Sequence, residues 1–183
     1  MTTRTIFENE LIQLRDDLKR MCFMVEAVYE KLFSAMQLGD RSTIIDISEQ
    51  DHQVRDMEKQ IESRCLSLIT KQQPMARDLR MVSASLKVVT DIKRVGDHVV
   101  DIAELLLRMN IKDFAAYSGH LDEMVRETKE MFHDSVGAFL KRSKDEAEQV
   151  IEKDDVIDEL FNTVKRDLIE HLKKDTANAD DCI

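Results

Sequence analysis

Residues 88–108 read VVTDIKRVGDHVVDIAELLLR, and the spacing of aliphatic and ionic residues in this run indicates how the chain folds. Successive helical residues turn through about 100°, so the aliphatic ones share one face: Val88, Ile92, Val95, Val99, Ile102 and Leu106. The opposite side carries Lys93, Asp97, Glu104 and Arg108, with Asp101 beside them. We expect a helix whose aliphatic side closes a bundle and whose ionic side faces outward. Gly96 lowers helix stability by roughly 1 kcal/mol relative to alanine, and therefore predicts the close approach of another helix or a ligand.

The sequence on both sides of this run also predicts helices rather than strands. The 183 residues include one proline and four glycines, so few positions interrupt a helix. We expect five long helices. The first runs from Thr5 to Gly39, and the second starts at Asp40 and carries apolar residues to Leu68. The third runs from Pro74 to about Asn110, the fourth begins between Asp113 and His120, and the fifth runs from Ser143 to before Asp175. Gly39 ends the first, Asp40 and Ser143 can cap the second and fifth, and Pro74 suits the first turn of the third. The fold class is all-α, with antiparallel neighbours joined by short loops.

The chain repeats itself at a constant offset of about 103 residues. The first two predicted helices then align with the last two without a gap. The aligned pairs include Leu18/Leu121, Met21/Met124, Tyr29/Phe132, Ala35/Ala138, Asp51/Asp154 and Val54/Ile157. We expect tandem three-helix bundles, the first over 1–111 and the second over 112–183. The second bundle is incomplete, with two helices of three, because the chain stops where a partner of the third helix would begin. Apolar faces on its two helices should be partly uncovered.

Charge and composition exclude several kinds of partner. The formal net charge is −10, so a surface that follows phosphate backbones or anionic lipids is not expected, and neither is nucleic acid. No apolar run approaches the roughly 18 residues that a membrane helix needs, and the N-terminus has no signal core. Three cysteines without metal or redox spacing are expected as reduced thiols. We expect a cytoplasmic protein with no membrane insertion.

Two blocks of sequence resemble the signature of the PhoU family. The first runs from Lys71-Gln-Gln-Pro74 to Ala76-Arg-Asp-Leu-Arg80, and the second is Asp91-Ile-Lys-Arg-Val-Gly-Asp-His98, followed by Ile102-Ala-Glu104. The resemblance extends over the whole chain as one and two-thirds of the family's repeat. It implies two three-helix bundles and a negative regulator of phosphate signalling. Such a regulator links the phosphate transporter ATPase subunit of an ABC transporter to a sensor histidine kinase, and is not an enzyme.

The resemblance also implies metal ions, divalent or iron, bound by acidic pairs spaced by one helical turn. Carboxylates at i and i+4 lie on one face and supply hard oxygen ligands. The predicted ligands are Asp51, Asp97, Asp101, Asp154 and Asp158. The predicted partner-binding residues are Arg80, Arg94, Asp97 and His98. A homodimer is expected, because a partly uncovered bundle favours self-association.

The chain departs from the family pattern at two positions. Lys93 stands where the family usually has an acidic residue, and Arg55 stands where the second repeat has Asp158. Each places a cation in the first bundle, where it would repel a metal ion and could instead pair with Asp97 or Asp51.

Two other readings remain open from the sequence. A ferritin-like di-iron protein would use the Glu-x-x-His spacing of Glu49/His52 and Glu130/His133, although periodicity turns both pairs away from the predicted apolar stripes. A metal-free helical scaffold would carry its charges for solubility alone. No Ser, His and Cys arrangement or glycine-rich phosphate loop indicates hydrolysis.

Overall fold

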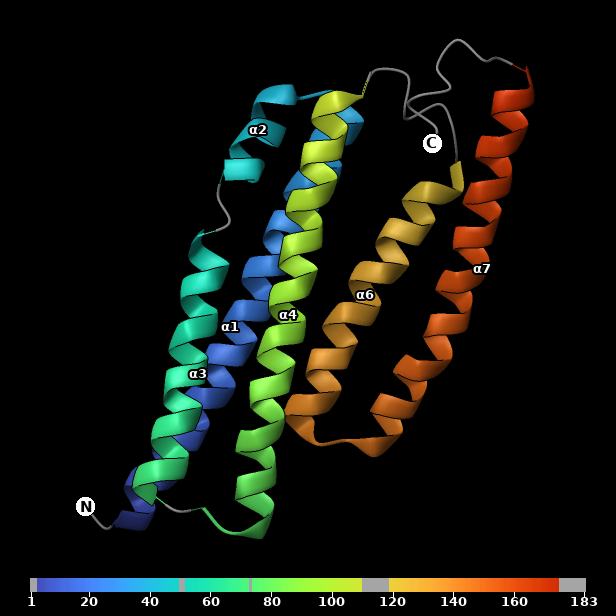
Figure 1. Ribbon diagram of the computed structural model, residues 1–183. Helices are drawn as coiled ribbons and strands as arrows, with labels where there is room; N and C mark the ends of the chain where they lie inside the picture. The colour runs from blue at the N-terminus through green and yellow to red at the C-terminus, as the bar shows by residue number, and fades with distance from the viewer. Residues whose placement is uncertain (1–2, 50–51, 73, 110–118, 175–183) are drawn as a thin grey trace.

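The computed structural model describes residues 3–49, 52–72, 74–109 and 119–174, and within these ranges it contains helices and no strand. The helices are α1 Thr3–Leu38, α2 Arg41–Glu49, α3 His52–Gln72, α4 Ala76–Arg108, α6 Gly119–Lys141 and α7 Lys144–Lys174 (Figure 1). The five long helices predicted from the sequence are α1, α3, α4, α6 and α7. The second predicted helix differs from expectation because its first part is the separate, short α2. Asp51 lies outside the described residues.

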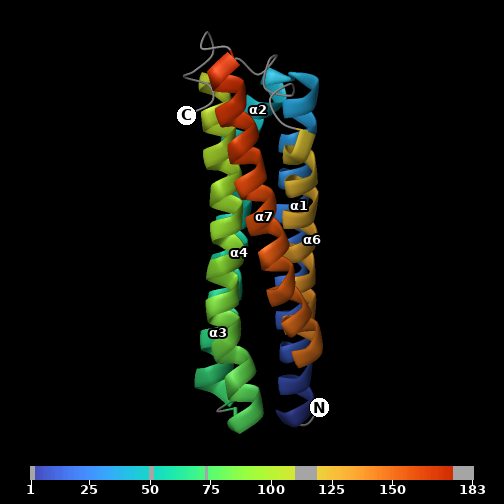
Figure 2. The ribbon, with the colours of Figure 1, turned by 90° about the vertical axis from the view of Figure 1, so that its right-hand side faces the viewer.

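Helices α1, α3 and α4 form a three-helix bundle, and α2 lies against one end of it (Figures 1 and 2). One core cluster joins the middle of these helices and includes Leu14, Leu18, Met21, Val25, Val54, Met57, Ile61, Val89 and Ile92. A second cluster lies at the end covered by α2 and includes Leu32, Ala35, Met36, Ile44, Ile47, Val99, Ala103 and Leu106. Full burial of a large aliphatic side chain contributes about 1.5–3 kcal/mol. These two clusters therefore hold α4 in place along its length.

An ionic network also joins α1 to α3. Arg64 of α3 donates to Asp17 and to Glu10 of α1, each at 2.8 Å. Gln13 donates to the same Asp17 carboxylate at 3.0 Å. Asp17 is buried, with 4% of its surface exposed, so its charge needs these donors. The network sets the register of α1 on α3.

The turns that end α1 and α6 have the same hydrogen bonds at an offset of 103 residues. Asp40 N–H donates to the carbonyl of Ala35 at 2.8 Å, and Ser143 N–H donates to that of Ala138 at 3.0 Å. The side chains of Asp40 and Ser143 both accept a backbone N–H from three residues on, at 3.2 Å in each case. Hydrogen bonds from Thr43 and Ser42 lower the pKa of Asp40 to about 2. Both predicted caps are confirmed, and the repeat seen in the sequence extends to backbone geometry.

Helix α6 packs against α1, and α7 packs mainly against α6 (Figure 2). Val136 of α6 is buried in the first core cluster together with residues of α1, and polar contacts flank this apolar packing. Tyr29 Oη donates to the carbonyl of Val125 at 2.8 Å, and His133 Nδ1 lies 2.7 Å from Glu26 Oε1. Lys129 pairs with Glu30.

Helix α7 is poorly covered within the described structure. Only Val164 of its apolar residues is buried, at 8% exposure. Its exposed apolar residues are Ile151, Val156, Phe161 and Ile169, the first at 71%. The expectation of partly uncovered apolar faces is confirmed for α7 but not for α6, which has none of the exposed large apolar side chains of the described structure. Separately, none of the described helices combines the length and hydropathy that crossing a bilayer requires.

The repeated turn allows a matched test of stability. Gly39 and Arg142 occupy equivalent positions with φ of 67° and 58°. We expect Arg142→Gly to raise the free energy of unfolding by about 1 kcal/mol, because glycine adopts left-handed φ without steric cost. Gly39→Ala should lower it by a similar amount, although a Cβ there would meet no atom within 4 Å. Urea denaturation measures both changes, and a loss of stability in Arg142→Gly would contradict the argument.

Candidate docking face and ionic cluster of helix α4

Helix α4 has a buried aliphatic face, as predicted, and Asp101, Glu104 and Arg108 of its predicted ionic side are exposed, but Lys93 and Asp97 are largely covered. Val89, Ile92, Val99, Ala103 and Leu106 are buried. The side chains of Arg94, His98 and Asp101 are each 67% exposed. These three residues therefore form an outward face, which we call the α4 docking face.

The ion pairs on this face are weakly held. Arg94 lies 3.7 Å from Asp91, and His98 Nδ1 lies 3.4 Å from Asp101. Pairs between exposed side chains contribute roughly 0–1 kcal/mol, so a partner could replace them at little cost.

Asp97 lies away from the docking face. Its side chain is 28% exposed and forms an ion pair with Lys93, one helical turn earlier, which is 25% exposed. Asp101 pairs instead with His98. Although Asp97 and Asp101 have the predicted i,i+4 spacing, the structure engages their carboxylates with different cations. The sequence-based expectation that Lys93 would pair with Asp97 is confirmed.

Two glutamates of α3 belong to the surroundings of this pair. Glu58 is half-buried, and burial raises its pKa. The negative charges of Glu62 and Asp97 raise this pKa further, and the positive charge of Lys93 lowers it. We call Glu58, Glu62 and Asp97 the α3–α4 carboxylate cluster. Sequence reasoning missed Glu58 and Glu62. Glu58 and Glu62 follow Arg55 by three and seven residues, so they lie one and two turns along the same side of α3. This spacing could have identified both glutamates from the sequence.

The residues of the first bundle do not fit the metal ion that the resemblance implies. The carboxylate of Asp97 is engaged by an ammonium group and that of Asp101 faces His98. Asp51 lies outside the described residues, and Asp154 and Asp158 are exposed on α7. Among the described residues no three His, Cys, Asp or Glu side chains are grouped to hold an ion. Metal binding by Asp154 and Asp158 stays a prediction.

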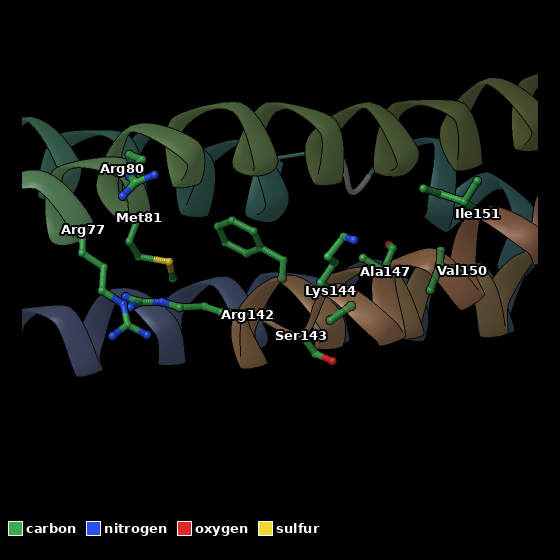
Figure 3. Close-up of a pocket in the computed structure, with 12 residues that line it drawn as sticks. Arg77, Arg80, Met81, Arg142, Ser143, Lys144, Ala147, Val150 and Ile151 are labelled. Carbon is green, nitrogen blue, oxygen red and sulfur yellow. The ribbon is translucent and has the colours of Figure 1, made fainter.

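A hollow of about 890 Å³ lies where the start of α4 meets the α6–α7 turn. Figure 3 shows Arg77, Arg80 and Arg142 at one end of it and Val150 and Ile151 at the other. Arg80 and Arg94 both lie on α4, and their separation in the sequence places them about 20 Å apart along the helix axis, at a rise of 1.5 Å per residue. The four predicted partner-binding residues therefore do not form one patch.

The wall of this hollow resembles a helix-packing surface. Its residues Ala138, Ala147 and Val150 align, at the offset of 103, with Ala35, Ile44 and Ile47. Those three are buried in the cluster that contains Val99, Ala103 and Leu106 of α4. The hollow is therefore built like the surface that α4 covers in the first half of the chain.

The residues of the di-iron alternative do not converge. His133 is engaged with Glu26 of α1, while Glu130 is exposed on α6 and His52 is exposed on α3. The side chain of Glu49 lies outside the described part of the structure.

The two described cysteines lack the properties of a nucleophile. Cys22 and Cys65 are buried and free. Burial raises the pKa of Cys22 to about 12 and that of Cys65 to about 11. Both thiols stay protonated at neutral pH, whereas a nucleophilic cysteine needs a lowered pKa.

Fold and site together define an all-helical bundle protein that presents an ionic helix face. The PhoU domain family model matches residues 18–106 and 121–182. The chain belongs to the PhoU family.

Named relatives and solved structures agree with this assignment. A phosphate-specific transport system accessory protein PhoU homolog from Clostridium acetobutylicum is 34% identical over 94% of this chain and 80% of that protein. PhoU of Escherichia coli K12 is 29% identical over 93% and 70%. The crystal structure of PhoU from Pseudomonas aeruginosa has a TM-score of 0.85 at 24% identity, covering 96% of this chain and 85% of that one. The PhoU structure from Streptococcus pneumoniae has a TM-score of 0.86 at 25% identity, covering 96% and 83%.

Gly96 provides a test of how closely α4 is held. A Cβ at Gly96 would lie 3.4 Å from Val54 Cγ1 and 3.5 Å from Val25 Cγ2, so the predicted close approach is confirmed. We expect Gly96→Leu to lower the free energy of unfolding by about 1–3 kcal/mol, because the larger side chain overfills this contact. Gly137→Leu on α6 is the matched control, since its Cβ would meet nothing within 4 Å. Equal effects of the two substitutions in urea denaturation would contradict the close contact.

Proposed function

We propose that this protein is a regulatory accessory protein of a phosphate transport system that acts by binding. In this proposal it is a cytoplasmic adaptor between the ATPase subunit of the phosphate ABC transporter and a sensor histidine kinase. It restrains the phosphate-starvation response. The names of the relatives, which are phosphate-specific transport system accessory proteins, support the transport context. A homodimer stays a prediction.

The observation that carries the proposal is the exposed α4 docking face on a helix whose other side is buried. Because a packed core holds the backbone of this face, the backbone needs no ordering when a partner binds, and the entropic cost of binding is limited to the side chains. Arg94 and His98 protrude from it, and arginine is among the residues that most often dominate binding energy at interfaces.

An apolar hollow beside this face strengthens the argument. It has a volume of about 860 Å³ and lies between α1, α4, α6 and α7. His98, Ile102 and Leu105 of α4 line it, and Leu105 is 55% exposed. Apolar surface next to weakly paired charges is the composition expected of a specific interface.

The docking face can be tested by direct capture. We expect Arg94→Ala combined with His98→Ala to weaken binding of the kinase's cytoplasmic portion, the transporter ATPase, or both at least tenfold, about 1.4 kcal/mol. The expected loss arises because both side chains are exposed and contribute little to the bundle itself. Binding is measured by surface plasmon resonance with the purified partners.

Arg126→Ala is the matched control for this test, because Arg126 is 63% exposed on α6 and pairs with its neighbour Glu127. It should leave both affinities unchanged. Unchanged capture of both partners by the Arg94/His98 variant would remove the docking claim and favour the metal-free scaffold.

A further inference from the structure

The charged side chains between α3 and α4 include a lysine, Lys93, which pairs with Asp97. We propose that the ammonium group of Lys93 is the resident cation of the α3–α4 carboxylate cluster and takes the place that a metal ion would need. The first bundle then folds and stays folded without a bound metal. This inference is independent of partner binding and concerns the charges inside the bundle.

The positions of the charges support this assignment. Lys93 and Asp97 are directly paired, and both are about three-quarters buried. Glu58 and Glu62 lie one turn apart on α3 and are both half-buried, and the charges of Lys93 and Asp97 on α4 act on Glu58. Lys93 and Lys59 are the cations that act on Glu58, against the charges of Glu62 and Asp97. Partly buried carboxylates require compensating positive charge, and Lys93 supplies it by pairing with Asp97 and by opposing the raised pKa of Glu58.

A tethered ammonium group differs from a metal ion in its chemistry. It offers three donors and no coordination site, and it is joined to α4 by a covalent stem, so it does not dissociate. A divalent ion requires several oxygen ligands at short range, and it would have to displace Lys93 from Asp97 first. The two positive charges would also repel each other across a partly dry contact. Lys93 and a metal ion therefore exclude each other.

The arrangement belongs to the first half of the chain. At the offset of 103, Arg55 aligns with Asp158 and Glu58 aligns with Phe161. Helix α7 thus has an exposed Phe161 in place of the half-buried Glu58, and its acidic pair, Asp154 and Asp158, is exposed. Any metal bound by Asp154 and Asp158 would be unaffected by changes at Lys93, so the second half serves as an internal reference.

The test compares thermal stability and manganese binding in the whole chain. The variants are Lys93→Met, which removes the charge but keeps the stem, and Lys93→Arg, which keeps the charge. In EDTA we expect Lys93→Met to melt about 2–4 °C below wild type by circular dichroism, since the carboxylates lose their cation. No three acidic side chains are grouped to hold an ion in the described structure of the wild type, where Lys93 engages Asp97. Removal of the ammonium group frees Asp97 and Glu58 to turn toward one ion, so millimolar MnCl2 should restore the lost stability of Lys93→Met. Electron paramagnetic resonance should then count one more bound Mn²⁺ than in wild type.

The controls separate this effect from binding elsewhere. Lys93→Arg should behave as wild type in EDTA and in MnCl2. Adding Glu58→Gln to Lys93→Met should abolish the rise in melting temperature that MnCl2 causes. A rise that wild type shows as well comes from manganese bound at another site. A wild-type melting temperature that rises with MnCl2, with the rise lost in Asp97→Asn, would overturn the proposal. So would a Lys93→Met variant that loses no stability in EDTA or gains none from MnCl2.

Discussion

The contact of α4 with α1 and α3 at Gly96 is the constraint on which the rest of the structure depends. A helix that passes within van der Waals distance of Val25 and Val54 cannot rotate about its axis without losing that contact. Its rotation decides which residues are buried and which reach solvent. The same contact therefore fixes the exposed position of Arg94 and the half-buried position of Asp97.

The two halves of the chain share backbone geometry and differ in how it is used. The turns at Gly39 and Arg142 repeat their hydrogen bonds, yet the first half has two buried core clusters and the second leaves most of α7 accessible. The charges differ as well, because the half-buried Glu58 has an aromatic residue, Phe161, as its counterpart. A duplicated framework thus carries a neutralised ionic contact in one half and an acidic surface in the other.

Periodicity in the sequence predicted the long helices and the two faces of α4, because burial of an amphipathic helix follows its own repeat. Local signals also placed the caps at Asp40 and Ser143. The candidate site was harder to predict. A pattern gives the direction of a side chain about its own helix and says nothing about which neighbour lies opposite. Glu58 was missed for that reason, and Asp97 was assigned to the outward face although only 28% of its side chain is exposed.

The polar character of the α1–α6 interface has a consequence for how firmly the two halves are joined. Contacts such as Glu30 with Lys129 and Glu26 with His133 lie near solvent, where dissolved salt screens them over about 8–10 Å. The aliphatic clusters of the first bundle carry no charge to screen. Rising ionic strength should therefore weaken the polar contacts between α1 and the α6–α7 hairpin, and leave the hairpin held to the first bundle mainly through Val136 in the first core cluster.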